Sequence, residues 1–321
     1  MWTELKARLL SVGDVQISGV SADAYIARSR AGPGAGKDGS LFFSYDGHRV
    51  RLGLGATSPV TIVHEGEGRA ILQVDGREYH GVLERPGLHC PRQAYITITA
   101  SCIFSCLYCS VPRLSGQRKS IDEIEGMVES VLPDIDTISL TSGVLTDIDE
   151  EEQYTLAVIN RLKRFNLPIG VSIFPTKNTP QRLFDAGASE VKFNLETATP
   201  GLFTAMCPGL DREGVRDALR RSVFLFGRDH VFSNIILGLG ETDEEMAVCI
   251  EELCREGIIP VIRPFSPGGD LAGWKRPDAA RLMRIFAVLD DALRRHDLHP
   301  EHALTMCPAC TGCDLIPGRD S

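Results

Sequence analysis

The sequence contains no uninterrupted apolar run of about 18 residues, the length that a membrane-spanning helix needs. It also has no excess of basic residues: 34 Lys and Arg stand against 43 Asp and Glu, giving a formal net charge of −9. The opening stretch "MWTELKARLL" mixes acidic and basic residues and lacks the apolar core of a signal peptide. These absences argue against a membrane protein and a non-specific nucleic-acid binder, and they predict a cytoplasmic protein.

Cysteine, by contrast, is plentiful, with ten residues in 321. Six of them form two close triplets: Cys102, Cys106 and Cys109, and then Cys307, Cys310 and Cys313. The other four are Cys90, Cys207, Cys249 and Cys254. A disulfide framework would spread its cysteines through a small secreted domain. Tight clusters in a long chain instead favour metal or redox chemistry.

Residues 1–89 have the pattern of a small β-rich domain, with short alternating runs broken by glycine and charged residues. The pairs Asp46-Gly47 and Asp75-Gly76 lie between such runs and predict hairpin turns. The stretch "RAGPGAGKDGS" at 30–40 lacks the Gly-Lys-Ser/Thr ending of a phosphate-binding loop, so we interpret it as a flexible loop.

From residue 94 onward, strand and helix patterns alternate. The predicted strands are 95–99, 136–141, 169–174, 190–195, 231–237 and 258–264. The predicted helices are 120–131, 149–165, 179–186, 211–227, 243–256 and 277–296. Six such units predict an α/β fold with a partial (β/α)6 barrel over 90–276, followed by a C-terminal helix and cysteine-bearing tail over 277–321. The active site of such a barrel lies at the carboxyl ends of its strands.

The first triplet directly follows the first of these strands and has the spacing C-x3-C-x2-C. Three thiolates in this arrangement can hold three iron atoms of a [4Fe–4S] cluster. Zinc is the alternative, but a structural zinc site needs four protein ligands and commonly uses C-x2-C pairs. No fourth cysteine lies nearby in the sequence.

This motif, with Tyr108 just before its last cysteine, resembles that of the radical SAM superfamily. The resemblance implies that Cys102, Cys106 and Cys109 bind a [4Fe–4S] cluster. The fourth iron of that cluster would bind S-adenosylmethionine, which is cleaved to a 5′-deoxyadenosyl radical. It identifies no further catalytic residue.

Three more stretches resemble the family at matching strand ends: "SLTSG" (139–143), "VKFNLET" (191–197) and "IILGLGET" (235–242). By this resemblance, the residues that bind S-adenosylmethionine are Tyr108, Thr141, Ser142, Gly143, Asn194, Glu196, Gly238, Gly240 and Glu241. Each stretch has a simpler explanation, since the glycines could form a turn and Asn194 could bond the local backbone.

The second triplet has the spacing C-x2-C-x2-C, which matches the first three cysteines of a bacterial ferredoxin motif. Zinc, with His299 or His302 as a further ligand, remains the alternative to an auxiliary [4Fe–4S] cluster. If the site holds a cluster, Cys90 is the candidate for its fourth ligand. His89, Cys207, Ser321 and the substrate are the alternatives for that position. Cys249 and Cys254 fit helix packing.

The motifs "NLET" and "LGLGET" resemble the corresponding sequences of the biotin synthase and lipoyl synthase branch. The C-terminal placement of the second triplet resembles one component of the two-protein lipoyl synthase of archaea and some bacteria. The expected reaction is sulfur insertion into a protein-bound octanoyl chain, with the auxiliary cluster as the sulfur source. Expected partners are an octanoylated lipoyl carrier protein or peptide, a second radical SAM protein, and an electron donor such as ferredoxin or flavodoxin. The alternatives are a radical enzyme that modifies a peptide or cofactor precursor, and a non-enzymatic metal-binding scaffold.

Overall fold

The computed structural model describes residues 1–27, 39–113 and 116–321. Most of the loop predicted at 30–40 therefore lies outside the described residues. No helix within the described ranges combines the length and the apolar character needed to cross a bilayer.

The N-terminal part is a closed β-barrel preceded by helix α1 (Trp2–Val12). Its strands run in the order β1-β3-β2-β6-β5-β4. They are β1 (Asp14–Gly19), β2 (Ser40–Tyr45), β3 (His48–Leu54), β4 (Thr61–Gly66), β5 (Arg69–Val74) and β6 (Arg77–Glu84). Asp46-Gly47 joins β2 to β3 and Asp75-Gly76 joins β5 to β6, and all four residues have positive φ. Both predicted hairpins are confirmed, because left-handed residues at the turn match the twist of the flanking strands.

The rest of the chain is built around a six-stranded parallel sheet whose strands follow one another in sequence order. They are β7 (Gln93–Thr97), β8 (Thr137–Thr141), β9 (Ile169–Ser172), β10 (Glu190–Lys192), β11 (Val231–Leu237) and β12 (Ile259–Pro264). The predicted partial (β/α)6 barrel is confirmed. Its strands are almost wholly buried, as parallel strands covered by helices should be.

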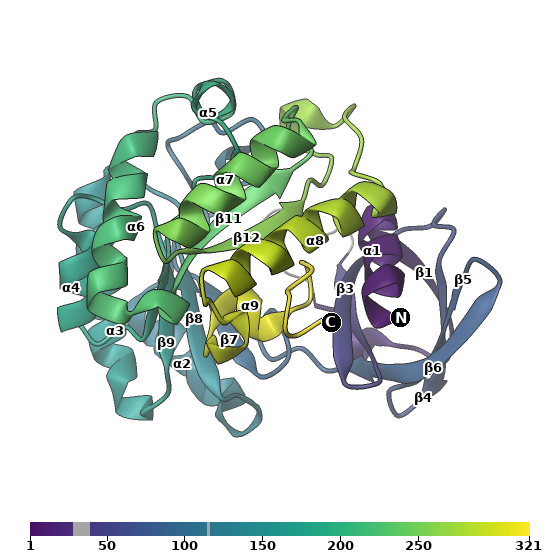
Figure 1. Ribbon diagram of the computed structural model, residues 1–321. Coiled ribbons are helices and arrows are strands. Elements are labelled where there is room, and N and C mark those ends of the chain that lie inside the picture. The colour runs from purple at the N-terminus through teal and green to yellow at the C-terminus, as the bar shows by residue number, and fades with distance from the viewer. Residues whose placement is uncertain (28–38, 114–115) are drawn as a thin grey trace.

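Helices connect and cover these strands (Figure 1). They are α2 (Ile121–Val131), α3 (Ile148–Leu162), α4 (Thr179–Asp185), α5 (Pro200–Met206), α6 (Arg212–Phe226), α7 (Asp243–Arg255), α8 (Ala279–Arg295) and α9 (Met306–Cys310). Capping boxes at Ser120 and Thr242 start α2 and α7. The prediction missed α5 and α9, whose seven and five residues are too short for a clear helical period.

The two parts meet where α1 packs against α8, with the C-terminal segment between the N-terminal barrel and the parallel sheet (Figure 1). Helix α9 contacts β7 there. The C-terminal segment that carries Cys307 and Cys310 thereby lies next to β7, the strand that precedes Cys102.

Candidate active site

Cys102, Cys106 and Cys109, here called the loop cysteines, lie just beyond the carboxyl end of β7. Backbone hydrogen bonds fix their loop: Ile103 N–H donates to the Val144 carbonyl at 2.8 Å, and Leu107 N–H donates to the Met206 carbonyl at 2.9 Å. Gly143 N–H donates to the Thr99 carbonyl at 2.9 Å. A Cβ on Gly143 would lie 2.1 Å from the Ser101 carbonyl oxygen, so this glycine allows the second strand's end to approach the loop.

A cavity of about 780 Å³ connects the loop cysteines with Cys307, Cys310 and Cys313, here called the tail cysteines. All six thiol-bearing residues line it, as does Cys90. This volume is in the range of enzyme ligand sites. The two triplets are some 200 residues apart in the sequence. In the folded protein, both line the same cavity.

The segment that carries the tail cysteines is bound at the amino ends of the parallel strands. Glu190, the first residue of β10, accepts hydrogen bonds from the Leu304 and Thr305 N–H groups, both at 2.8 Å. Gln93, the first residue of β7, accepts from Met306 N–H at 3.0 Å and donates to the Met306 carbonyl at 3.0 Å. The loop and tail cysteines therefore approach the barrel interior from opposite ends.

The N-terminal barrel also holds this segment. Arg51 N–H donates to the Gly312 carbonyl at 2.7 Å, and the Arg49 guanidinium donates to the Cys310 carbonyl at 3.2 Å. Lys6 pairs with Asp320 at 2.7 Å, with both side chains essentially fully buried. The β-rich unit thus forms one wall of the tail cysteine site.

Charged side chains contact Cys307 directly. Lys192 Nζ lies 3.2 Å from Cys307 Sγ, and Arg263 Nη2 lies 3.0 Å from the same sulfur. Arg263 also pairs with Asp314 at 2.9 Å. Burial lowers the pKa of Lys192, but the charge of the Cys307 thiolate outweighs it and raises the pKa to about 12.

Arg51 lies beside another tail cysteine. Its Nη1 is 3.9 Å from Cys313 Sγ, and its Nε donates to Ser40 Oγ at 2.8 Å. Its guanidinium lies over the Phe42 ring at 5.9 Å from the centroid. The Nη2 atom is buried and has no hydrogen-bond partner in the described part of the chain. Arg51 is one of the residues that line the cavity.

Cys90 is 1% exposed and packs with Cys310 and Phe42. The hydrogen bond with the Cys90 thiol lowers the pKa of Cys310, with further lowering from the charge of Arg49. The structure thus brings Cys90 to the tail cysteines. His299 and His302 instead pair with acidic residues, including His302 with Asp229 at 2.8 Å.

The side chains in the described ranges include no group of three or more His, Cys, Asp or Glu close enough to hold a single metal ion. A zinc ion needs its ligands about 2.0–2.3 Å from one centre. No three of these side chains in the described ranges meet that requirement.

Of the residues predicted to bind S-adenosylmethionine, six line the cavity: Tyr108, Thr141, Ser142, Gly143, Asn194 and Glu196. Glu196 is a non-glycine residue with a φ of 59°, held there by hydrogen bonds between its backbone and the neighbouring β11. Burial raises the pKa of its carboxyl group. Backbone strain at a buried acid is a common feature of functional sites.

The Ser142 hydroxyl is already engaged. It donates to Glu151 Oε1 at 2.6 Å and accepts from Thr99 N–H at 3.0 Å. Glu151 also accepts from the Thr99 hydroxyl and from Arg118. This network anchors the end of β8, and contact of "SLTSG" with S-adenosylmethionine stays a prediction.

Gly238, Gly240 and Glu241 lie in the turn after β11 and are not among the residues that line the cavity. Both glycines have a φ of 110°. Glu241 accepts hydrogen bonds from Gly238 N–H at 2.7 Å and Leu239 N–H at 2.9 Å, and it pairs with Arg281 at 3.0 Å. Here the carboxylate stabilises the turn, and contact with the cofactor remains a prediction.

Sequence reasoning missed several residues of the cavity. Lys192, Asn234 and Arg263 line it from strand positions that looked like ordinary core. Asn234 Oδ1 is buried and has no partner in the described ranges. The alternation of Lys192 with Asn194 in "VKFNLET" was an available signal, since residues two apart in a strand share a face. Cys207 lies 3.5 Å from the Tyr108 hydroxyl, beside the loop cysteines.

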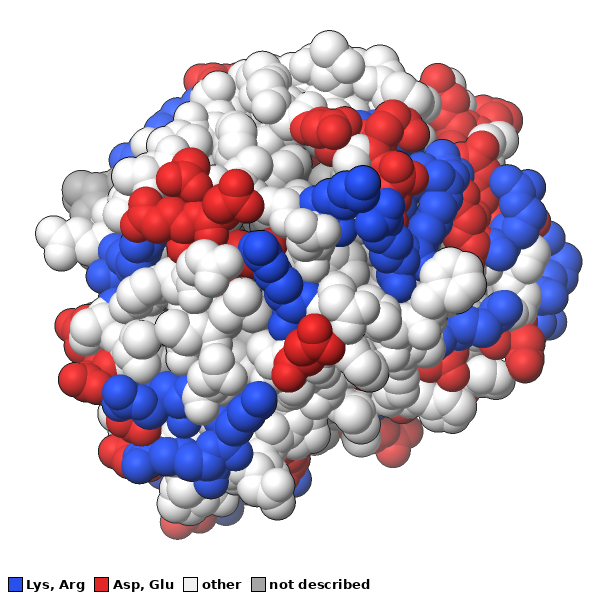
Figure 2. Space-filling view, turned by 90° about the vertical axis from the view of Figure 1, so that its left-hand side faces the viewer, with Lys and Arg blue, Asp and Glu red and all other residues white. Residues whose placement is uncertain are grey.

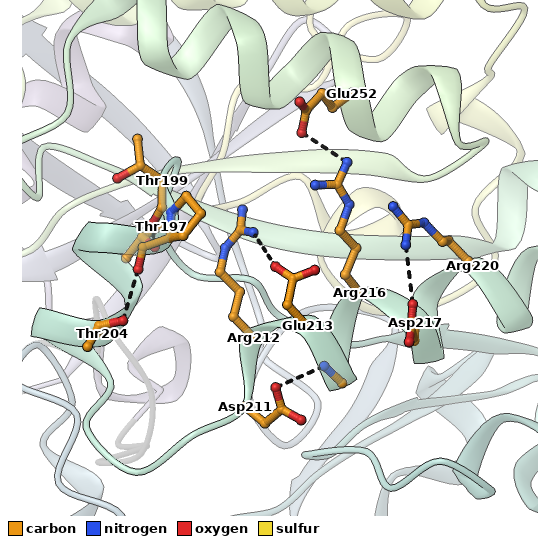
Figure 3. Close-up of polar contacts among 12 residues, drawn as sticks. Thr197, Thr199, Thr204, Asp211, Arg212, Glu213, Arg216, Asp217, Arg220 and Glu252 are labelled. Carbon is orange, nitrogen blue, oxygen red and sulfur yellow. Dashed lines mark hydrogen bonds and ion pairs between the residues drawn. The ribbon is translucent and has the colours of Figure 1, made fainter.

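The basic residues of α6 do not form a free patch. Figure 3 shows Arg216 paired with Glu252 and Arg220 paired with Asp217, at 2.9 and 3.2 Å. In Figure 2, basic and acidic residues interleave across the visible face. Exposed pairs of this kind contribute little and leave little net charge for attracting a partner.

The comparisons with known proteins agree with this geometry. Residues 96–253 match the model of the radical SAM superfamily. Among solved structures, a radical SAM methyltransferase from Sphaerobacter thermophilus has a TM-score of 0.54 at 16% identity, covering 73% of this chain and 75% of that one. The FeFe-hydrogenase maturase from Carboxydothermus hydrogenoformans has a TM-score of 0.53 at 18% identity, covering 63% of this chain and 51% of that one. Residues 96–253 of this chain therefore carry a radical SAM domain.

The chain is also similar to lipoyl synthases at low identity. Lipoyl synthase of Corynebacterium glutamicum is 26% identical over 254 residues, covering 70% of this chain and 71% of the relative. Lipoyl synthase of Leptospira biflexa is 27% identical over 207 residues, covering 58% of this chain and 64% of the relative.

Proposed function

We propose that this protein is a radical SAM sulfur insertion enzyme that forms a C–S bond on a protein-bound octanoyl chain. The observation that carries the proposal is the single cavity lined by both cysteine triplets. A radical formed at one triplet and a sulfur source at the other must reach the same substrate carbon. The similarity to lipoyl synthases supports the choice of substrate.

The residues present fit two [4Fe–4S] clusters. The loop cysteines supply three thiolates and leave a fourth iron for S-adenosylmethionine, and the tail cysteines with Cys90 supply four. When bound, the first cluster with S-adenosylmethionine would supply the radical, and the second would supply sulfide. The unpartnered buried atoms Arg51 Nη2 and Asn234 Oδ1 are consistent with ligands in this cavity.

The chain's own residues bind and shield the reactants. Tyr108, Asn194 and Glu196 line the loop-cysteine side of the cavity and would hold the ribose and adenine. Apolar residues form much of the remaining wall, namely Leu88, Phe104, Val144, Ile173 and Phe174. An octanoyl chain is favoured there by burial of its methylene groups, at about 0.8 kcal/mol each. The same apolar wall excludes water from a reactive radical.

An octanoylated carrier protein or peptide is the proposed substrate. A second radical SAM protein would form the other C–S bond, and ferredoxin or flavodoxin would supply electrons. The ion pairs of Arg216 and Arg220 on α6 argue against that face as the carrier's docking site, because these two cations are already paired.

The test is anaerobic incubation of the reconstituted protein with S-adenosylmethionine, dithionite and an octanoylated peptide, followed by mass spectrometry. The expected product carries one added sulfur, and 5′-deoxyadenosine accumulates. Cys307→Ala should still form deoxyadenosine but add no sulfur, whereas Cys254→Ala, which removes a buried cysteine from α7, should behave as wild type. Deoxyadenosine without sulfur transfer in the wild type would favour modification of a peptide or cofactor precursor. Absence of 5′-deoxyadenosine would contradict the radical enzyme and favour a non-enzymatic metal-binding scaffold.

A further inference from the structure

Two buried cations beside the tail cysteines have no acidic partner. Lys192 is 2% exposed and Arg51 is 6% exposed. In the described part of the chain, neither forms an ion pair with a carboxylate; their polar neighbours include the Cys307 and Cys313 sulfurs. A buried charge without a partner strongly destabilises the folded state. These cations therefore require an anion in the cavity.

The third cation, Arg263, is compensated. It pairs with Asp314 at 2.9 Å while donating to Cys307 Sγ. The buried positive charges without a carboxylate partner are therefore those of Lys192 and Arg51. A [4Fe–4S] cluster in its usual oxidised state, held by four thiolates, carries a net charge of about −2. The two positive charges of Lys192 and Arg51 equal this negative charge in size.

The loop cysteines have different surroundings. Within the described ranges no lysine or arginine is hydrogen-bonded to a loop-cysteine sulfur: Lys119 lines the cavity but donates to the Thr97 carbonyl at 2.6 Å. Arg113 donates to the Cys109 carbonyl at 3.1 Å and pairs with Asp270. In the described part of the chain, cationic side chains therefore contact sulfur at the tail cysteines and not at the loop cysteines.

We propose that Lys192 and Arg51 hold the negative charge of the tail centre and raise its reduction potential above that of the loop centre. This inference rests on the proposed function, because it assumes an iron–sulfur cluster at the tail. The physical reason is that nearby positive charge stabilises the reduced, more negative state, and charge and hydrogen bonds to sulfur are among the factors that set cluster potentials.

This asymmetry suits sulfur insertion. A carbon radical contributes one electron and a sulfide lone pair contributes two, while the new C–S bond uses only two. As the Fe–S bonds of that sulfide break, the remaining electron would stay on iron of a cluster held by the tail cysteines. Lys192 and Arg51 would lower the free energy of that reduced state.

The test is a redox titration of the reconstituted full-length protein, followed by electron paramagnetic resonance. The triple variant Cys102→Ala/Cys106→Ala/Cys109→Ala isolates the tail centre, and Cys307→Ala/Cys310→Ala/Cys313→Ala isolates the loop centre. The tail centre should have the higher potential. Lys192→Met and Arg51→Met should each shift it to more negative values, and Lys192→Arg should keep it near wild type.

Lys119→Met is the matched control. Lys119 lines the same cavity but donates to the Thr97 carbonyl at 2.6 Å, so its removal should leave the tail potential unchanged. Loss of tail iron from both charge-removing variants, but not from Lys192→Arg, would also support the charge-holding role. Unchanged potentials with full iron content in Lys192→Met and Arg51→Met would overturn the inference. Iron and sulfide analysis of the wild type comes first: a tail site that takes zinc or no iron contradicts the proposed function instead.

Discussion

The two cysteine triplets share a cavity but are built in different ways. The loop cysteines lie on one short loop, held by backbone hydrogen bonds such as that between Ile103 and Val144. The tail cysteines depend on buried side chains from distant parts of the chain, including Glu190, Lys192 and Arg51. The loop site is thus a local property of its sequence, whereas the tail site is a property of the whole fold.

The largest effect should come from the loop cysteines. Cys106→Ala removes one of three thiolates, so deoxyadenosine formation should fall to background, and iron should drop from about eight to about four per chain. Chromatography of the reaction and iron analysis measure both. Cys249→Ala, a buried cysteine of α7, is the control and should retain both. Deoxyadenosine formation by Cys106→Ala at the wild-type rate would refute the assignment of this loop.

The tail site should be sensitive to a residue that is remote in sequence. Lys6→Met leaves the Asp320 carboxylate buried without its partner, and breaking a buried pair costs about 3–5 kcal/mol. Urea unfolding measures the loss. Arg8→Met breaks the more exposed pair with Asp75 and should cost less than about 1 kcal/mol. Equal losses in the two variants would mean that the buried pair has no special role.

A smaller effect is expected where the tail segment crosses β9. A Cβ on Gly170 would lie 2.0 Å from Thr305 Oγ1, so Gly170→Ala should destabilise the protein by about 1–3 kcal/mol and weaken iron retention at the tail. Gly126→Ala in α2 is the control, because nothing lies within 4 Å of its added methyl group. It should be neutral or stabilising by up to about 1 kcal/mol. Thermal unfolding distinguishes the two, and similar results would show that the tail segment adapts.

The smallest effect concerns pH. His230 pairs with Glu190 at 2.9 Å, and this hydrogen bond raises the pKa of His230 above 6.5. Because the folded pKa is the higher one, the stabilisation is present below about pH 6.5 and is lost as pH rises through the folded pKa. The contribution should be under about 1 kcal/mol, since the histidine is partly exposed. His230→Gln should reduce this part of the pH dependence of urea unfolding; an unchanged pH profile would contradict it.

The contrast between the triplets also explains what the sequence could predict. Strand and helix periods located all six βα units, and the C-x3-C-x2-C spacing located the loop site, because both are short-range patterns. The environment of the tail cysteines could not be read in this way. In the sequence, Lys192 and Arg263 are single charged residues within apolar strands. The fold shows that both line the cavity. Arg51 comes from a different barrel altogether. Cys90 was an expectation from sequence position, and the structure places it beside Cys310.

The Lys6–Asp320 pair has a consequence for the order of assembly. Its two members are 314 residues apart, and Lys6 also donates to the Thr311 carbonyl within the tail. Contacts of such long range carry a large loop-closure entropy cost, which slows folding. The wall that the N-terminal barrel contributes to the tail cysteines is complete only when both ends of the chain are in place. Iron delivered to the tail would meet a finished pocket, whereas the loop cysteines need only their own strand and its neighbours.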